Sequence, residues 1–253
     1  MKSSLLRQLG RIAGLLLISL LALELFFVAR IAAMAVLDPH STSFERSEAW
    51  RLLTDKGRIE WSQHWVPDGR IAATLKRAVI ASEDAAFTEH GGVEWDAIER
   101  AWERNQRAET RADQRNGAGS ASGNARPRVE PKLVGGSTIT QQLAKNLFLS
   151  GERTPLRKAQ EFVLTLALEA CLSKRRILEI YLNHVEWGEG VFGAQAAARH
   201  YYRVDAAQLG ALPAARLAVM LPAPKRFEKR PGSPYVVARA ATVVARMGAV
   251  ELP

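Results

Sequence analysis

The feature that most constrains this chain is an apolar stretch near its amino terminus. Residues 12 to 29 are apolar apart from Ser19 and Glu24, and a shorter apolar run, 31 to 37, follows Arg30. An α-helix of about 18 residues is about 27 Å long, at roughly 1.5 Å per residue, which nearly matches the hydrocarbon core of a bilayer. We therefore expect residues 12 to 37 to form one transmembrane anchor.

The flanking charges predict the orientation of this anchor. Lys2, Arg7 and Arg11 precede it, so the positive-inside rule places residues 1 to 11 in the cytoplasm and the remaining chain outside. A cleaved signal peptide is the alternative, because Ala33-Met34-Ala35 resembles a cleavage site. The anchor is favoured because the apolar stretch exceeds the roughly 7 to 15 residues of an ordinary signal core.

Composition narrows the choice of binding partner. The 253 residues have a formal net charge of +9, which predicts an anionic partner such as nucleic acid, a membrane surface or a phosphorylated substrate. Nucleic acid is disfavoured, because the sequence has no zinc-finger or RNP-type motif and its six Trp residues are scattered. The single cysteine, Cys171, excludes an internal disulfide and a multi-cysteine metal site.

Beyond the anchor, the spacing of apolar residues is helical almost throughout. No convincing alternation of apolar and polar residues predicts a strand, so the fold class is mainly α. Residues 38–66 are interpreted as a juxtamembrane segment, and residues 105–131, which are polar and without apolar periodicity, as a flexible loop. Helices are expected over residues 71–84, 96–104, 138–147, 155–172, 174–183, 194–202, 206–221 and 234–247.

Two polar motifs interrupt this apolar pattern. The first, residues 83–91, places Glu83 and Asp84 at the end of an apolar helix. The second, residues 135–146, begins with two glycines, and Thr138 with Gln141 matches a capping box at a helix start. Paired carboxylates together with amides and a lysine are typical of a sugar-transfer site, because such groups bind a glycan or a diphosphate.

A cation cluster follows at the start of the next expected helix. Thr154 and Pro155 match a helix cap with proline at the first helical position. Arg157 and Lys158 then lie within one turn of Glu161. A second basic run, residues 174–176, is interpreted as a solvated face or a contact with the membrane surface.

In this order the motifs resemble those of glycosyltransferase family 51, the peptidoglycan transglycosylases, and specifically the monofunctional biosynthetic type. The resemblance covers about residues 67–224. It implies a lysozyme-like helical domain, residues 67–253, with two lobes called head and jaw. The matching motifs are Glu83-Asp84 through His90-Gly91, residues 135–146, Arg157-Lys158 with Glu161, Lys174 with Ile177-Leu178-Glu179 and Tyr181-Leu182-Asn183, and Glu186-Trp187-Gly188 with Gly193.

The resemblance also implies an activity and a location. The expected reaction polymerises lipid II, an undecaprenyl-diphosphate-linked disaccharide pentapeptide, into β-1,4-linked glycan strands and releases undecaprenyl diphosphate. The expected location is the cell inner membrane, with one span and the catalytic domain in the periplasm. The implied partners are lipid II, the growing glycan strand and the membrane, and cell-division proteins are compatible with them. No cofactor is required by the sequence and no metal ligands are predicted, although a divalent cation, Mg or Mn, is compatible with the chemistry.

Residue roles are carried over from the family motifs. Glu83 is the expected general base, and its position among apolar residues beside Asp84 should raise its pKa. Glu161 is expected to assist the leaving group, whereas His90 is expected to be structural. The candidate substrate-binding residues are Asp84, Ser137, Thr138, Gln141, Gln142, Lys145, Arg153, Arg157 and Lys158.

The sequence departs from the family pattern at a few positions and leaves two alternative functions. A lytic, muramidase-like enzyme acting on finished glycan also uses two carboxylates, but it has no diphosphate for the cation cluster to bind. A catalytically silent, glycan-binding partner of the division machinery is disfavoured by the intact Glu83 and Glu161. The departures, Gln160, Gln195, Pro213 and Tyr202-Arg203-Val204, concern the jaw and the substrate groove.

Overall fold

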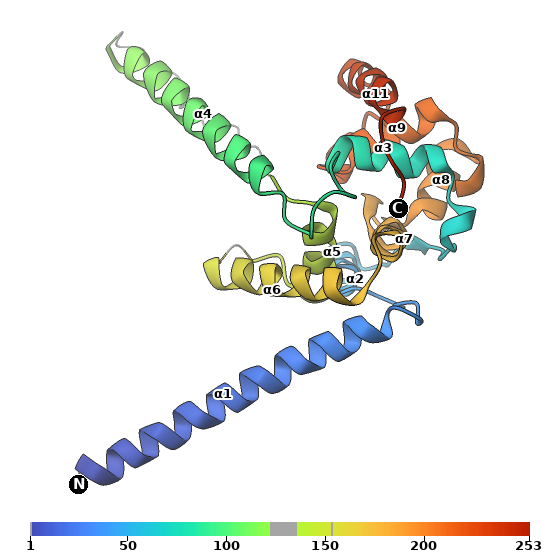
Figure 1. The fold of residues 1–253 in the computed structure, drawn as a ribbon. Coiled ribbons are helices and arrows are strands. Elements are labelled where there is room, and N and C mark those ends of the chain that lie inside the picture. The colour runs from blue at the N-terminus through green and yellow to red at the C-terminus, as the bar shows by residue number, and fades with distance from the viewer. Residues whose placement is uncertain (1, 122–135, 153) are drawn as a thin grey trace.

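The computed structural model describes residues 2–121, 136–152 and 154–253. Within these ranges the chain forms eleven α-helices and three very short strands, which confirms the mainly α class (Figure 1). The helices are α1 (Lys2–Ala33), α2 (Ser43–Lys56), α3 (Ala73–Glu83), α4 (Trp95–Ala121), α5 (Ile139–Phe148), α6 (Pro155–Cys171), α7 (Lys174–His184), α8 (Ala194–Tyr202), α9 (Ala211–Met220), α10 (Pro224–Phe227) and α11 (Pro234–Met247).

The core is built around α7, which joins two groups of helices. On one side α3, α9 and α11 pack against one another, and on the other α5 packs against α6 and α7 (Figure 1). Helix α7 buries Ile177, Ile180 and Leu182, which point in different directions around the helix. The first turn of α7 is charged, but the residues from Ile177 to His184 are all buried except Glu179, so this part of the helix lies in the interior. The core therefore holds the ends of α3, α5 and α7 close together.

A small sheet closes the core beside α2. Strand β3 (Val191–Phe192) pairs in parallel with β1 (Ser62–Gln63) and antiparallel with β2 (Glu186–Gly188). Gly190 connects β2 to β3 with φ +71°, and a Cβ on it would lie 2.0 Å from the carbonyl oxygen of Glu60. Only glycine avoids both the strained backbone and this clash.

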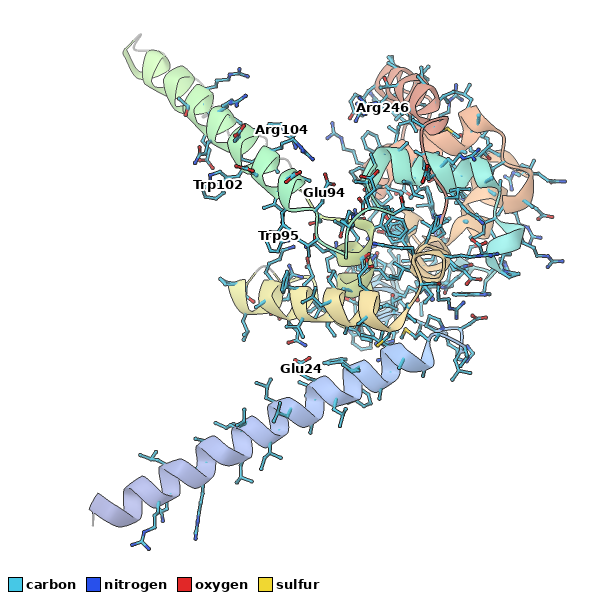
Figure 2. The ribbon with its side chains drawn as sticks, viewed as in Figure 1. Glu24, Glu94, Trp95, Trp102, Arg104 and Arg246 are labelled. Atoms are coloured by element: carbon cyan, nitrogen blue, oxygen red, sulfur yellow. The ribbon has the colours of Figure 1, made fainter. Side chains whose placement is uncertain are left out.

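Helix α1 is long and apolar enough to cross a membrane. The candidate span is Arg7–Ala33, and its 18-residue apolar window has a mean hydropathy of 2.6 and is not buried by the rest of the protein. The carboxyl end of α1 packs on α6, and Glu24 projects toward α6 (Figure 2). Ile31 is fully buried in the domain core, so α1 is continuous with the folded domain rather than joined to it by a free tether.

The segment after α1 is docked by Arg176, which is therefore not part of a solvated face, whereas Arg175 between the two other cations is largely exposed. The Arg176 guanidinium donates to the carbonyl oxygen of Met34 at 2.8 Å, to that of Leu37 at 3.0 Å and to Asp38 Oδ1 at 2.7 Å. Lys174 is also engaged, in an ion pair with Glu169 at 2.8 Å. These cations are therefore committed to contacts within the protein.

Two helices differ from the sequence prediction. The expected juxtamembrane segment contains α2, whose start is fixed by a capping box between Thr42 and Glu45 and whose end is capped by Gly57 in the left-handed conformation. The expected helix 206–221 is divided into a 3₁₀ turn, Ala206–Gln208, and α9. Pro213 lies in the first turn of α9, where proline is tolerated.

The flexible loop predicted for residues 105–131 is wrong for its first part. Helix α4 continues to Ala121, and Figure 2 shows Trp95, Trp102 and Arg104 along it. The physical reason is composition: residues 104–115 are rich in Ala, Arg, Gln and Glu, which have high helix propensity even without an apolar face. An ion pair between Arg107 and Glu103, one turn apart at 3.0 Å, adds to this. Residues 122–131 lie outside the described residues.

Candidate active site

Glu83 lies at the last turn of α3 and is partly buried, and the next residue fixes the surrounding chain. Asp84 Oδ2 accepts a hydrogen bond from the backbone N–H of Ile139, the first residue of α5, at 3.0 Å. Its other oxygen, Oδ1, accepts from His90 Nε2 at 2.8 Å. Asp84 is itself buried, so its carboxylate joins the end of α3 to the start of α5. Asp84 therefore stabilises the backbone of the site and is not exposed to solvent.

The carboxylate of Glu83 belongs to a hydrogen-bonded chain that reaches α7. Gln142 Nε2 donates to Glu83 Oε2 at 3.1 Å, and Tyr181 Oη donates to Gln142 Oε1 at 2.9 Å. Burial raises the pKa of Tyr181 well above its ordinary value, so the phenol remains protonated and acts as the donor. The amide of Gln142 is thereby oriented with its NH₂ group toward Glu83.

The environment of Glu83 favours its neutral form more than water does. Burial raises the pKa of Glu83 above its usual range, and the neighbouring charge of Asp84 adds to this. Hydrogen bonds from Gln142 and Ser82 oppose the shift by stabilising the carboxylate. The expectation of a raised pKa from the sequence is consistent with this result, and a carboxylate of this kind is a stronger proton acceptor than an exposed one.

Helix α5 begins where the sequence predicts, at Thr138. The Thr138 hydroxyl accepts from the backbone N–H of Gln141 at 3.1 Å and donates to the carbonyl oxygen of Gly92 at 2.6 Å. The Gln141 side chain returns to the backbone N–H of Thr138 at 3.1 Å, which completes the capping box. Thr138 is buried and its hydroxyl both donates and accepts a hydrogen bond. It therefore stabilises the start of α5 and does not line the cavity.

The cation cluster surrounds Glu161 at the start of α6. Glu161 is 3% exposed, and its Oε2 pairs with Arg157 Nη1 at 2.9 Å while its Oε1 pairs with Lys158 Nζ. The Thr154 side chain caps the helix by accepting from the backbone N–H of Arg157 at 3.2 Å. Two cations thus share one buried carboxylate, which fixes them and leaves an excess of positive charge.

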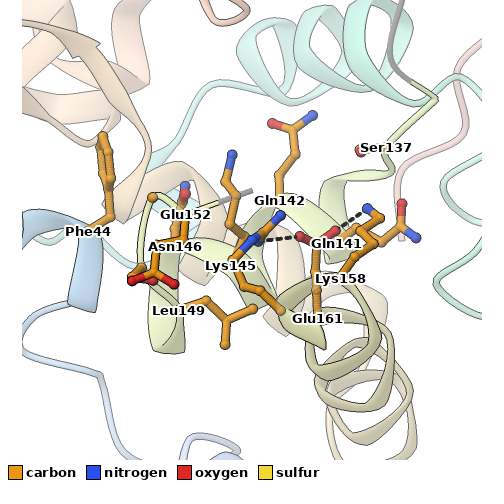
Figure 3. Close-up of a pocket in the computed structure, with 13 residues that line it drawn as sticks. Phe44, Ser137, Gln141, Gln142, Lys145, Asn146, Leu149, Glu152, Lys158 and Glu161 are labelled. Atoms are coloured by element: carbon orange, nitrogen blue, oxygen red, sulfur yellow. Dashed lines mark hydrogen bonds and ion pairs between the residues drawn. The ribbon is translucent and has the colours of Figure 1, made fainter. Parts of the chain in front are cut away.

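A cavity of about 320 Å³ lies between α5 and α6 (Figure 3). It brings together most of the candidate substrate-binding residues, whereas Asp84 and Thr138 lie outside its lining. Arg153 lies outside the described residues. The lining consists of Phe44, Ser137, Gln141, Gln142, Lys145, Asn146, Leu149, Ser150, Gly151, Glu152, Arg157, Lys158 and Glu161.

A second cavity adjoins the first on the side of α4. Its volume is about 260 Å³, and Ile98, Ala101 and Trp102 of α4 form its apolar wall. Ser137, Gln141 and Lys158 line both cavities, so the two spaces meet beside the lysine ammonium group. An apolar space therefore lies next to the cation cluster.

One group of side chains in the described part of the chain has metal-ligand character. Ligand atoms of Asp84, His90 and Glu94 lie within 4.8 Å of one another. The backbone N–H of Gly92 donates to His90 Nδ1 at 3.0 Å, so Nε2 carries the proton that bonds to Asp84, and Glu94 is paired with Arg100 at 2.6 Å. Asp84 and His90 are thus already engaged with each other and with the backbone, and no step of the chemistry requires an ion here.

The sequence interpretation gave no role to several residues that the structure places at the site, among them Tyr181 and Phe44. Tyr181 was part of a quoted motif but received no role, and a buried tyrosine next to two acidic residues could have suggested one. Phe44 lines the cavity from α2. The capping residues Thr42 and Glu45 could have predicted that a helix begins here, but not that Phe44 faces the cavity.

Comparison with known proteins places this geometry in a family. The sequence model of the family described as Transglycosylase matches residues 52–248. A protein of Burkholderia pseudomallei named biosynthetic peptidoglycan transglycosylase is 50% identical over 98% of this chain and 88% of its own length. A protein of Paraburkholderia xenovorans with the same name is 46% identical over 98% of this chain and 94% of its own length. The resemblance seen in the motifs is thereby confirmed, and the chain belongs to the transglycosylase family.

Proposed function

We propose that this protein polymerises lipid II into β-1,4-linked peptidoglycan glycan strands and releases undecaprenyl diphosphate. The observation that carries the proposal is a single cavity that joins Gln142, the partner of Glu83, to Lys145, Arg157 and Lys158. Glu83 is not part of the cavity lining but is hydrogen-bonded to a residue that is. A base next to a polycationic pocket suits a reaction in which a hydroxyl attacks a sugar carbon and a diphosphate departs. The names of the relatives agree with this reaction.

Glu83 is the general base in this proposal. The 4-hydroxyl of the acceptor GlcNAc gives its proton to Glu83 as its oxygen bonds to C1 of the donor MurNAc. The bond between C1 and the diphosphate oxygen breaks at the same time, so one displacement converts the α-linked donor into a β-linked product. Gln142 holds the receiving carboxylate oxygen in place with its amide.

The cations stabilise the departing diphosphate. Lys145, Arg157 and Lys158 offset the negative charge that grows on the leaving oxygen. The positive end of α6, at Thr154 and Pro155, adds to their field. Arg153 is proposed to join them, as the resemblance implies.

Glu161 acts through its two partners rather than on the substrate itself. Both of its oxygens are paired, one with Arg157 and one with Lys158, and it is buried beneath them. It is therefore a positioning residue that keeps the two cations at the cavity and prevents their mutual repulsion. The sequence predicts that Glu161 assists the leaving group, and in this proposal it does so through the two cations.

We propose that the anchor is not cleaved and that its carboxyl end lies on the periplasmic side of the membrane. Met34 is 4% exposed and packed in the domain core, at the centre of the suspected cleavage site. Cleavage there would remove a residue that the fold uses. The basic amino terminus supports a cytoplasmic start, and partners among cell-division proteins stay a prediction from the resemblance.

The proposal is tested with the full-length protein in detergent and lipid II carrying a labelled disaccharide. We expect undecaprenyl diphosphate to appear together with a polymer that a muramidase degrades. Release of soluble fragments from purified peptidoglycan without use of lipid II would instead support the lytic function. Binding of glycan with neither product would support the silent partner.

A further inference from the structure

We propose that Phe44 is the platform of a hexose-binding subsite at one end of the cavity, so that the helix next to the membrane anchor binds the sugar of the substrate. The inference rests on the proposed function and deepens it. Phe44 precedes residue 52, where the match to the family model begins, and it is the only lining residue contributed by α2 in the described part of the chain.

Phe44 is held rigidly in this position. The capping box places Thr42 and Glu45 in the interior at 0% and 1% exposure. Glu45 Oε1 lies 2.7 Å from His184 Nδ1 and accepts from Gln63 Nε2 at 2.8 Å, which ties α2 to α7 and β1. The Phe44 ring meets the edge of Phe192 with centroids 6.1 Å apart. The ring is thereby fixed by backbone and ring contacts before any ligand arrives.

The order of groups along the site matches the order of groups along the substrate. The apolar cavity of Ile98 and Trp102 comes first, Lys158 lies where the cavities meet, and Phe44 lies at the opposite end from Lys158 and Glu161 (Figure 3). A lipid-linked sugar has an isoprenoid chain, then a diphosphate, then a hexose. With the diphosphate at the cations and the chain in the apolar cavity, the hexose extends toward Phe44.

The surroundings of Phe44 also suit a sugar rather than a lipid chain. Lys145, Asn146 and Glu152 share its cavity, and they offer hydrogen-bond donors and acceptors for hydroxyl and amide groups. An aromatic ring among such groups can pack against the C–H face of a hexose while they bind its polar edge. An isoprenoid chain packed there would displace water from Asn146 and Glu152 without replacing its hydrogen bonds, which costs free energy.

The kinetic test compares Phe44→Ala with Trp61→Ala in the full-length protein. Trp61 stacks on the same Phe192 at 4.4 Å but does not line the cavity, so it is a matched control for the loss of an aromatic contact. We expect Phe44→Ala to raise KM for lipid II by about tenfold with kcat within about twofold, the scale of one lost aromatic contact. Phe44→Tyr should restore KM, and Trp61→Ala should leave it unchanged. An unchanged KM in Phe44→Ala, or an equal rise in Trp61→Ala, would overturn the subsite.

Two further measurements test whether Phe44 binds the sugar or the lipid, and whether the subsite exists independently of the proposed function. The rise in KM for Phe44→Ala should be the same with a four-isoprene donor as with the natural chain, whereas a rise that disappears with the short chain would assign Phe44 to the lipid. Saturation-transfer NMR with soluble GlcNAc tetramer should show binding to the wild type and to Trp61→Ala but not to Phe44→Ala. This result would support the subsite even if lipid II were not polymerised, and equal binding by all three proteins would refute it.

Discussion

Gln142 presents its amide NH₂ group to Glu83, with Nε2 lying 3.1 Å from Oε2. The amide cannot turn over without cost, because its oxygen accepts the hydroxyl of the buried Tyr181 at 2.9 Å. Glu83 is therefore a largely desolvated carboxylate with a fixed amide donor at Oε2 and a longer contact, 3.5 Å, from the Ser82 hydroxyl at Oε1. That combination explains a raised pKa together with a defined orientation, both of which a general base requires.

The first prediction concerns Glu83 itself. Glu83→Gln keeps the shape of the side chain but cannot accept a proton, so polymerisation should fall by at least about a hundredfold, the scale of a lost general base. The unfolding temperature should stay close to that of the wild type. Turnover of lipid II at the wild-type rate would remove Glu83 from the mechanism.

The second prediction uses the hydrogen bond from Gln142. Because this bond stabilises the charged form of Glu83, its loss in Gln142→Leu should raise the pKa of Glu83 further. A base works only when deprotonated, so the acidic limb of the pH–rate profile should move to higher pH. Lys145→Ala is the comparison, because it should weaken lipid II binding while leaving that limb in place. A limb that stays fixed, or moves to lower pH, in Gln142→Leu would contradict the assignment.

The third prediction distinguishes positioning from direct catalysis at Glu161. Glu161→Gln removes the charge that holds Arg157 and Lys158, so polymerisation should fall by about tenfold or more, as expected when both partners of a buried ion pair are disturbed. The acidic limb of the pH–rate profile should remain where it is in the wild type, because Glu83 is unchanged. Loss of that limb in Glu161→Gln would mean that Glu161 itself titrates in the reaction.

Most of the helices could be predicted from the sequence because their signals are local. The caps at Thr138, Thr154 and Ser173 and the apolar spacing of α7 identify elements whose stability comes from their own residues and one buried face. Helix α4 could not be predicted over its full length, since it extends beyond its apolar residues and depends on propensity instead. The spacing of apolar residues cannot reveal such a helix.

Several residues of the candidate site could be proposed from the sequence, but their arrangement could not. Glu83, Lys145, Arg157 and Lys158 belong to recognisable motifs, so their chemistry is readable from the sequence. That Asp84 and Thr138 brace the site, and that Glu161 pairs with both cations, depends on which atoms meet across α3, α5 and α6. The position of Phe44 at the cavity could not be predicted either, because nothing in its own segment indicates that α2 packs on α5.

The fourth prediction concerns stability at Glu186, outside the cavity. Burial raises its pKa to about 7, the charges of Glu48 and Glu228 add to this, and Lys225 opposes it. Its Oε1 is buried and makes no well-formed hydrogen bond, although Lys225 Nζ lies 3.4 Å away. Since the folded pKa exceeds the ordinary value of 4.5, the folded state prefers the protonated form. The protonated side chain of Glu186 contributes its full share to the free energy of unfolding below about pH 4.5, and this contribution is lost as the pH rises to about 7.

Glu186→Gln should therefore stabilise the protein most above pH 7. The gain is on the order of 3 kcal/mol at about 1.36 kcal/mol per pKa unit, and it should vanish near pH 4.5. Glu189→Gln is the control of opposite sign, because its ion pairs with Lys56 and Arg51 lower the pKa of Glu189 to about 2. Denaturant unfolding at pH 5, 6, 7 and 8 checks both variants. A gain for Glu186→Gln that does not grow with pH would contradict the linkage.

The last prediction concerns the anchor. A variant that begins at Ser41 lacks α1 but keeps the cap of α2 and all the proposed catalytic residues, so it should polymerise lipid II in detergent. It should bind membranes weakly, because the one strongly apolar span of the described chain is gone. Its turnover should fall on lipid II embedded in a bilayer, where the anchor confines enzyme and substrate to one surface and raises their effective concentration.

The same variant should also be less stable, because the structure shows the end of α1 packed into the domain. Phe148 loses its edge contact with Phe27, whose ring centroid lies 5.4 Å away, and Arg176 loses the carbonyl of Met34. Arg176→Ala in the full-length protein separates the loss of stability from the loss of membrane attachment. It should lower the unfolding temperature, but turnover on bilayer substrate should be kept because α1 is retained. Equal turnover of the Ser41 variant and the full-length protein on bilayer substrate would refute the role of α1. Recovery of the natural protein from the soluble periplasm with a start near Val36 would show instead that the segment is cleaved.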